Sequence, residues 1–157
     1  MKYKLLTVLL LGTIFMASQA TADKAIFAGG CFWCMESDFE KLEGLTDVIS
    51  GFAGGTLEKP TYSGDHTGHY EAVEITYDPS KVTYQGLLDH FWVNIDPFDD
   101  RGQFCDKGFS YLSAIFVADD AERKMAETSK QKVIRQFADQ RVVTPILQSS
   151  VFYPIKG

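Results

Sequence analysis

The junction around Gly29, Gly30 and Cys31 constrains the fold of this chain more than any other feature. The short apolar run 25–28 predicts a strand, and the two glycines join it directly to an amphipathic segment, 31–42. The first N–H groups of a helix have no partner within the helix and carry partial positive charge. A cysteine at this point is therefore favoured as a thiolate nucleophile. The glycines permit a close approach to it.

Apolar residues alternate with turn signals along the rest of the chain, and strands are interleaved with helices that each have one apolar face. This order predicts one α+β domain, a two-layer sandwich in which helices pack against a mixed sheet. The predicted strands are 25–28, 48–52, 71–77, 111–117 and 142–152, and Pro145 is a candidate bend in the last of them. The predicted helices are 31–42, 83–95 and about 119–137, and the predicted loops are 56–68 and 99–110.

The N-terminus has the pattern of a secretory signal. Lys2 and Lys4 precede the apolar stretch 5–17, and Ala20-Thr21-Ala22 has the small residues of a cleavage site. The apolar stretch is shorter than the roughly 20 residues of a membrane-spanning helix. We expect a signal peptide over 1–22, a mature domain over 23–157, and a periplasmic or secreted protein without stable membrane association. A retained N-terminal anchor is the alternative.

Charge and cysteine content narrow the function. The net charge is −6, and removal of residues 1–22 with two lysines and no acidic residue makes it −8. This balance disfavours nucleic acid and anionic membranes as partners. Three cysteines is an odd number for an exported protein, so at least one thiol is expected to be reactive.

Cys31 and Cys34 form a C-x-x-C pair at the predicted helix start, a spacing typical of thiol–disulfide exchange. Cys34 could instead be a small buried residue of the helix. Phe32 and Trp33 indicate an apolar pocket beside the thiolate. The two cysteines with Cys105 and a nearby histidine, His66 or His69, could also bind zinc, but a second closely spaced pair of ligands is missing. We therefore expect neither a metal nor another cofactor.

Two further segments carry candidate residues. Glu71 shares its strand face with Val73 and Ile75, so its carboxyl should point inward, where burial keeps an acid able to donate a proton near neutrality. A hydrogen-bonded carboxylate at a strand end is the alternative. The segment 103–111 places a thiol, a carboxylate and a phenol on a loop that enters a strand, although it could be a solvated loop.

Five motifs occur in order along the chain: GGCFWCMESDFEKLEG, SGFAGG followed by PTY, TGHYEAVEITYDP, LLDHFWVNIDP and RGQFCDKGFSYLSAIF. Together they resemble the A-type peptide-methionine sulfoxide reductases over residues 24 to about 154. The resemblance implies a two-layer α+β fold and reduction of methionine S-sulfoxide, free or in oxidised proteins, as repair of oxidative damage. Cys31 resembles the nucleophile that attacks the sulfoxide sulfur, and Phe32 and Trp33 resemble the wall that holds the substrate methyl group.

The resemblance also assigns the groups around the sulfoxide oxygen. Glu71 resembles the acid that protonates it, Tyr62 and Tyr111 resemble phenols that hydrogen-bond it, and Asp106 resembles a supporting polar group. The loop between Tyr62 and Gly68 is shorter than in many relatives. A sulfoxide is a poor electrophile until its oxygen is protonated or strongly hydrogen-bonded, and these groups supply that activation.

Attack on the sulfoxide leaves a sulfenic acid on Cys31, which a second thiol must resolve. Many relatives carry resolving cysteines in a C-terminal tail, whereas this sequence has none beyond Cys105. Resolution then falls to Cys34, to Cys105 or to an outside thiol, and we expect a monomer served by a thioredoxin-like donor. The competing hypothesis is a thiol–disulfide exchange protein that uses Cys31 and Cys34 alone, which leaves Glu71 unexplained.

Overall fold

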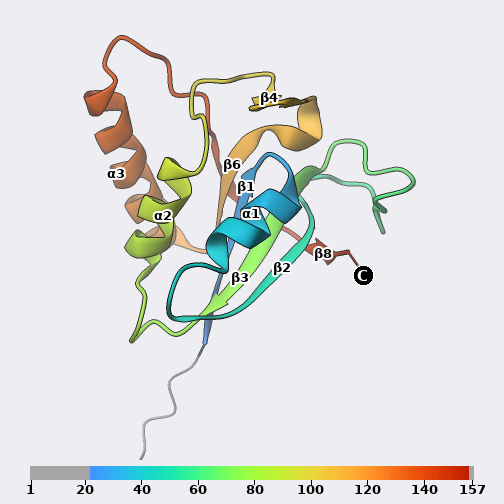
Figure 1. Ribbon diagram of the computed structural model, residues 1–157, viewed down its shortest axis with the longest axis horizontal. Coiled ribbons are helices and arrows are strands. Elements are labelled where there is room, and N and C mark those ends of the chain that lie inside the picture. Colours follow the sequence, from blue (N-terminus) through green and yellow to red (C-terminus); the bar gives the residue numbers. More distant parts are fainter. Residues whose placement is uncertain (1–21, 156–157) are drawn as a thin grey trace, which may run out of the picture.

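The computed structural model describes residues 22–155, in which three helices pack on a six-stranded sheet (Figure 1). The sheet strands are β1 (Asp23–Gly29), β2 (Leu45–Ala53), β3 (Tyr70–Tyr77), β6 (Ser113–Val117), β7 (Ile146–Gln148) and β8 (Tyr153–Pro154). The helices are α1 (Phe32–Phe39), α2 (Tyr84–Val93) and α3 (Asp120–Gln136). A separate hairpin, β4 (Gly102–Gln103) and β5 (Asp106–Lys107), is followed by the 3-10 turn η1 (Phe109–Tyr111).

The strand order is β7-β6-β1-β3-β2-β8. β7 runs parallel to β6, and every other pairing is antiparallel. The predicted α+β sandwich with a mixed sheet is therefore confirmed. The signal peptide predicted over 1–22 lies, but for its last residue, outside the described residues. No helix within 22–155 is long and apolar enough to cross a membrane.

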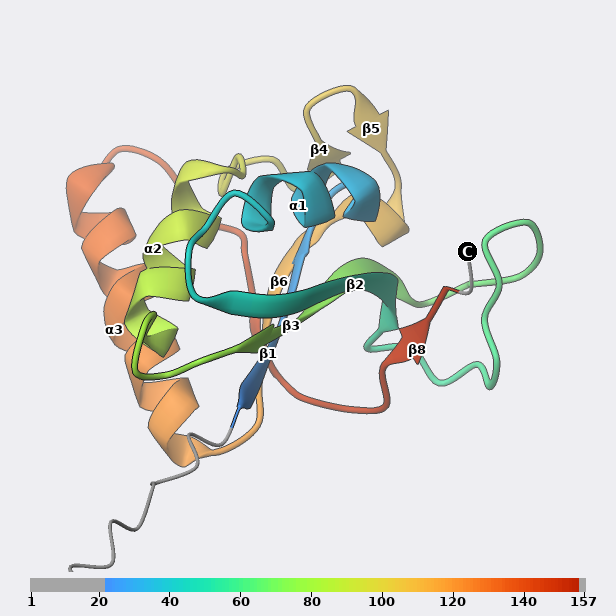
Figure 2. The ribbon, with the colours of Figure 1, turned by 60° about the horizontal axis from the view of Figure 1, so that its bottom comes forward.

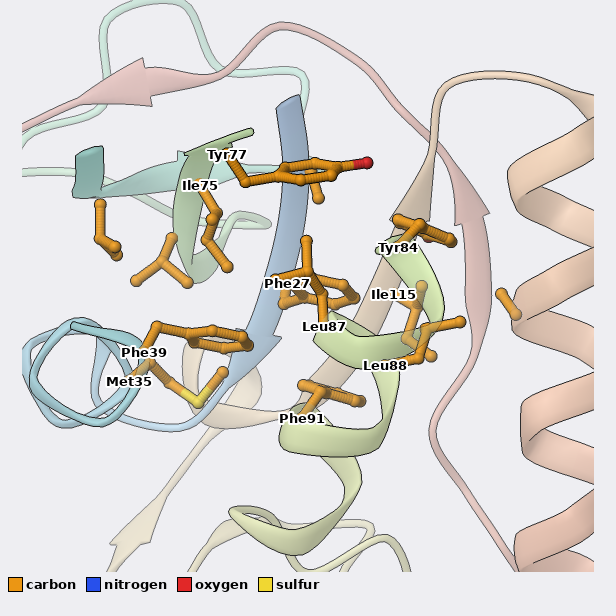
Figure 3. Packing of buried hydrophobic residues seen from close by; sticks show 14 of the residues in the cluster. Phe27, Met35, Phe39, Ile75, Tyr77, Tyr84, Leu87, Leu88, Phe91 and Ile115 are labelled. Atoms are coloured by element: carbon orange, nitrogen blue, oxygen red, sulfur yellow. The ribbon is translucent and has the colours of Figure 1, made fainter. Parts of the chain in front are cut away.

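The main core lies between the sheet and the helices, and aromatic rings fill its centre (Figure 3). Phe27 of β1 stacks on Phe39 of α1, with ring centroids 5.6 Å apart, and on Phe91 of α2 at 5.1 Å. Stacked rings of this kind combine a large buried area with favourable ring geometry. This packing fixes α1 and α2 on β1, and so fixes the start of α1 beside the end of β1.

The opposite face of the sheet has a smaller apolar cluster, built on Ile26, Ala28 and Phe116. Leu147 and Phe152 from the C-terminal segment pack against it. The chain after β7 therefore crosses this face and reaches β2 at the other edge of the sheet, where β8 pairs with it (Figure 2).

The single last strand predicted over 142–152 is wrong. Its residues form β7 at one edge of the sheet, and β8 follows at the opposite edge. The apolar residues after Pro145 are shared between the two edges and the second apolar cluster, and that division depends on partners far away in the sequence.

Two of the other boundaries that differ from the sequence prediction have a local cause. The first helix ends at Phe39 rather than Leu42, because Lys41 and Leu42 make tighter bonds to carbonyls three residues back, and Gly44 turns the chain with φ +96°. The strand predicted over 111–117 is β6, which begins only at Ser113, because residues 109–111 form η1.

Candidate active site

Cys31 lies between β1 and α1, and the two glycines before it are required by packing. A Cβ on Gly29 would lie 2.6 Å from both Ile95 Cγ2 and Met35 Sδ, and Gly30 has φ +91°. Cys31 is the N-cap of α1 and its carbonyl accepts the first helical bonds, so its partly exposed side chain is held at the helix N-terminus.

Glu71 lies beside this helix start and is only 2% exposed. Its Oε2 accepts a hydrogen bond from the backbone N–H of Phe32 at 3.1 Å, and Phe52 of β2 lies opposite it in the sheet. Burial is the largest influence on Glu71 and raises its pKa, against the opposing effects of the Phe32 N–H and the nearby His66. The inward orientation predicted from strand parity is what the structure shows.

Three aromatic rings form a cluster next to Cys31. Trp33 and Tyr62 have ring centroids 4.8 Å apart and are 48% and 53% exposed, while Phe32 lies beneath them at 5.0 and 5.9 Å and is fully buried. In this structure Trp33 and Tyr62 therefore present the apolar surface, and Phe32 supports it from below. The predicted wall of Phe32 and Trp33 is thus extended by Tyr62.

Tyr62 also lines a cavity of about 630 Å³. Residues of the loop and of the C-terminal segment form this cavity, including Pro60, Tyr153 and Ile155. Tyr62 therefore belongs both to the aromatic cluster and to the lining of this cavity.

Cys34 is exposed, so the interpretation of this residue as buried core is wrong. Desolvation, a hydrogen bond with the Cys31 thiol and the negative charges of Cys31, Asp106 and Asp38, in this order, raise the pKa of Cys34. The thiols of Cys31 and Cys34 are therefore close enough in the first turn of α1 to influence one another. All three cysteines are free.

Tyr111 completes the group of predicted residues. The charge of Glu71 is the first cause that raises the pKa of Tyr111, followed by desolvation and the charges of Asp106, Tyr62 and Cys31. The groups that shift the pKa of Tyr111 come from β3, the β4–β5 hairpin, the β2–β3 loop and the start of α1. They act on it because the fold brings these four segments together. Figure 2 shows the β4–β5 hairpin next to the N-terminal end of α1.

Cys105 lies at the tip of that hairpin, where it is exposed. The residue before it, Phe104, has φ +49° and is itself exposed. The hairpin is flanked by Gly102 and Gly108, both with positive φ. The predicted loop 99–110 is therefore a defined turn that presents a cysteine to solvent, and not an irregular segment.

Sequence reasoning missed the role of Gln103. Its buried amide accepts the N–H of Asp96 at 2.7 Å and donates to the Asp96 carbonyl at 2.8 Å, and a Cβ on Gly30 would lie 2.7 Å from its own Cβ. Gln103 thus ties the hairpin to the residues after α2 and lies against the chain just before Cys31. It is part of the fifth motif, RGQFCDKGFSYLSAIF, but no local pattern distinguishes its buried amide from a solvated one.

No cluster of three or more histidine, cysteine or acidic side chains within residues 22–155 is arranged to hold a metal ion. The site offers instead one partly exposed thiol, a second thiol beside it, a buried carboxyl whose raised pKa favours the protonated form, and two phenols. This set can attack an electrophile with sulfur and deliver a proton to an oxygen next to it.

Comparisons with known proteins agree with this chemistry. Residues 23–157 match the family described as Peptide methionine sulfoxide reductase. Peptide methionine sulfoxide reductase MsrA of Bacillus subtilis (strain 168) is 46% identical over 138 residues, 85% of this chain and 77% of that protein. Methionine sulfoxide reductase A of Corynebacterium diphtheriae has a similar structure, with a TM-score of 0.75 and 29% identity over 88% of this chain and 72% of that one.

A structure of Mxr1 from Saccharomyces cerevisiae in complex with Trx2 has a TM-score of 0.62 at 20% identity, over 89% of this chain and 85% of that one, and supports the fold alone. The family match covers nearly all of the described residues, and the protein from Bacillus subtilis shares nearly half of its residues with this chain over most of the length of both. The chain belongs to the peptide methionine sulfoxide reductase family.

Proposed function

We propose that this protein reduces methionine S-sulfoxide, free or in oxidised proteins, to methionine, with Cys31 as the nucleophile and Glu71 as the acid. The observation that carries the proposal is the pairing of a partly exposed thiol at the N-terminus of α1 with a buried carboxyl bound to the next N–H. A thiol–disulfide exchange protein that uses Cys31 and Cys34 alone leaves that carboxyl unexplained.

The chemistry balances in two steps. The Cys31 sulfur attacks the sulfoxide sulfur while Glu71 protonates the sulfoxide oxygen, and the oxygen passes to Cys31. Methionine is released, its sulfur reduced by two electrons, and Cys31 becomes a sulfenic acid. A thiol then attacks the sulfenic sulfur, releases water and forms a disulfide, which an external dithiol reduces.

Two phenols and a carboxylate support the first step. We infer that Tyr62, from the β2–β3 loop, and Tyr111, from η1, donate hydrogen bonds to the sulfoxide oxygen; the contact of Tyr62 with Trp33 and the influence of Glu71 on Tyr111 support this. The negative charge of Asp106 helps to raise the pKa of both Tyr111 and Cys34. Trp33 offers the apolar face for the substrate methyl group, with Phe32 beneath it.

Cys34 is our candidate for the resolving thiol, because it is already within hydrogen-bonding reach of Cys31. The charge of Cys31 is one cause that raises the pKa of Cys34, and a sulfenic acid is neutral. Oxidation of Cys31 therefore removes that contribution and makes the Cys34 thiolate easier to form once it is needed. Cys105 would need movement of the whole β4–β5 hairpin.

A thioredoxin-like donor and an exported location complete the proposal. The yeast neighbour was crystallised in complex with Trx2, and the exposed Cys34 of this chain is accessible to such a dithiol. The pattern of Lys2, Lys4 and the apolar stretch 5–17 supports export, with action as a monomer in the periplasm or outside the cell. N-terminal sequencing of the native protein should begin at Asp23.

The decisive assay uses purified residues 23–157 with dithiothreitol and a peptide that contains methionine sulfoxide of defined configuration. We expect methionine from the S epimer and none from the R epimer. The same preparation should be tested for reduction of an unrelated protein disulfide. Reduction of the disulfide without any methionine would favour the exchange protein over the reductase.

Replacement of Cys34 by serine separates the two steps. The variant should release methionine at the normal rate in its first turnover. Dithiothreitol should support its further turnovers. Turnover with a thioredoxin as the only donor should fall by more than about tenfold, because a thiol held nearby has a far higher effective concentration than an external one. Normal thioredoxin-supported turnover would transfer the resolving role to Cys105 or to the donor.

A further inference from the structure

Tyr62 packs against Trp33 of α1 but does not belong to the regular elements that hold Cys31 and Glu71. It belongs to the loop of residues 54–69, which has neither helix nor strand of its own. Within the loop, Thr61 N–H donates to the Asp65 carbonyl at 3.0 Å, and Thr67 N–H donates to Asp65 Oδ1 at 2.9 Å. These bonds define the tip around Tyr62, and His66 of the tip stacks on Phe52 of β2 with ring centroids 5.0 Å apart, whereas the base of the loop has a separate attachment.

His69 makes that attachment at the base of the loop. Its ring is fully buried, Nδ1 accepts the N–H of Gly55 at 3.2 Å, and Nε2 lies 2.9 Å from the carbonyl of Leu57. A carbonyl can only accept, so Nε2 carries the proton and the ring is the neutral tautomer with one donor and one acceptor. The last residue of the loop is thereby bonded to its second and fourth residues.

Packing fixes the orientation of the same ring. It meets Tyr153 of β8 edge-on at 5.6 Å and Phe52 of β2 at 6.4 Å, and Gly55 leaves the space that the ring occupies. Both nitrogen atoms of His69 are used within the protein, and the ring is shielded from solvent. His69 therefore has no free atom with which to act on a substrate.

Glycines lie at both ends of the loop. Gly54 and Gly68 have φ +82° and +80°, a conformation that other residues rarely adopt. His69 directly follows Gly68, and its bonding partners Gly55 and Leu57 come just after Gly54. The bonds of His69 therefore join the two ends of the loop beside these glycines.

We propose that His69 is a positioning residue for the reductase: it holds the loop 54–69 closed, so that Tyr62 lies against Trp33 and is presented to the substrate. Only the expected change in KM rests on the proposed function; the closure of the loop does not. If the loop is closed for only a fraction of the time, the apparent affinity for substrate falls by that fraction. Cys31 and Glu71, which belong to α1 and β3, remain in place.

The variant His69→Phe keeps an aromatic ring and removes both hydrogen bonds. We expect KM for a methionine sulfoxide peptide to rise about tenfold, as an order of magnitude for two lost buried bonds, while the first-turnover rate at saturation changes less than about threefold. His69→Asn, which can still accept from Gly55, should give an intermediate KM. If His69→Phe does not fold, His69→Asn carries the test by the same criteria.

A matched control separates positioning from a general loss of stability. Ser129 is buried between α2 and α3 and accepts the indole N–H of Trp92 at 2.9 Å, remote from the loop. Ser129→Ala should lower the urea midpoint of unfolding without a change in KM. A KM increase in this control as large as in His69→Phe would overturn the positioning role.

A double mutant shows whether His69 acts through Tyr62. In a Tyr62→Ala background, adding His69→Phe should cause no further rise in KM. An equal rise in both backgrounds would overturn the proposal, as would a folded His69→Phe with unchanged KM.

A measurement without catalysis makes the test independent of the proposed function. In a Trp92→Phe background, Trp33 is the remaining tryptophan, and Tyr62 covers part of it. Acrylamide quenching of its fluorescence should increase in His69→Phe, and the increase should vanish when Tyr62 is alanine. This result in a protein that failed to reduce sulfoxides would refute the proposed function and leave the loop closure standing.

Discussion

The two sides of the Cys31 site are built in different ways. On one side, Cys31 and Glu71 belong to α1 and to the interior strand β3, and a backbone hydrogen bond links the helix start to the carboxyl. On the other side, Tyr62, Tyr111 and the hairpin of residues 102–108 belong to loops or short turns and are mostly exposed. The atoms assigned to bond making and proton transfer are on the rigid side.

The difference indicates how precisely each group of residues must be positioned for its part of the reaction. A nucleophile and an acid must keep a fixed separation, and side chains on packed helices and strands keep it best. Groups that surround substrates of different sequence, or that meet a reductant, gain from adaptable loops. Substitutions on the rigid side should therefore impair the chemical step, and those on the loop side should impair binding or recycling.

The largest effect is expected for Cys31→Ser, which should abolish methionine formation while the protein stays folded, because the side chain is at the surface of the helix start. Peptide analysis by mass spectrometry measures the product, and circular dichroism checks the fold. Turnover by the folded variant at even a tenth of the normal rate would remove Cys31 from the mechanism.

Glu71→Gln should slow the first turnover by about 10²–10⁴-fold, the usual contribution of a general acid. Burial raises the pKa of Glu71, so its carboxyl stays protonated to higher pH and loses its proton only as pH rises through that raised value. The wild-type rate should fall over that range as the acid is lost. The variant should lack this decline, and alkylation of Cys31 by iodoacetamide should still occur. Equal rates for both proteins across pH 5 to 8 would exclude Glu71 as the acid.

The linkage between Glu71 and stability has a defined sign. A group with a raised pKa in the folded state contributes stability that is present below its unfolded pKa and is lost as pH rises through its folded value. Urea midpoints of the wild type should therefore decline relative to Glu71→Gln as pH increases through that range. The opposite trend would show that the carboxyl is stabilised in its charged form.

On the loop side, Tyr111→Phe should reduce kcat/KM by about tenfold, the order of one lost hydrogen bond to a charge that develops in the transition state. The effect should be far below that of Glu71→Gln. Single-turnover kinetics with the S epimer measure it, with Tyr84→Phe, a buried tyrosine at the start of α2, as the control. A loss of kcat/KM as large as that of Glu71→Gln would contradict the distinction between the chemical role of one side and the binding role of the other.

Cys105→Ser should have the smallest effect, less than about twofold on thioredoxin-supported turnover, because its thiol is at the tip of a separate hairpin. Steady-state kinetics and disulfide mapping check this together. A large loss, with Cys31 paired to Cys105 in the wild type, would make the hairpin part of the redox cycle.

The sequence predicted those parts of the site that local patterns determine. The two glycines before Cys31 and the face of Glu71 follow from the strand-to-helix junction and from the alternation of a strand, and both are found in the structure. Trp33 and Cys34 follow from their place in the first helical turn. The family resemblance added Tyr62, Tyr111 and Asp106, which no periodicity connects to Cys31.

The parts that depend on distant partners could not be predicted. The separation of β7 from β8 is decided by free edges at opposite ends of the sheet. The buried roles of His69 and Gln103 depend on backbone groups up to 14 residues away that become partners only in the fold. The sequence alone leaves His69 as a candidate metal ligand, because a sequence does not show which polar side chains find backbone partners.

The most direct test of the account is a single turnover without reductant. Fully reduced protein is mixed with an excess of S-sulfoxide peptide, and methionine, free thiols and disulfides are measured together. The account predicts one equivalent of methionine per protein, a fall from three free thiols to one, and a Cys31–Cys34 disulfide. Three remaining thiols and no methionine would contradict it.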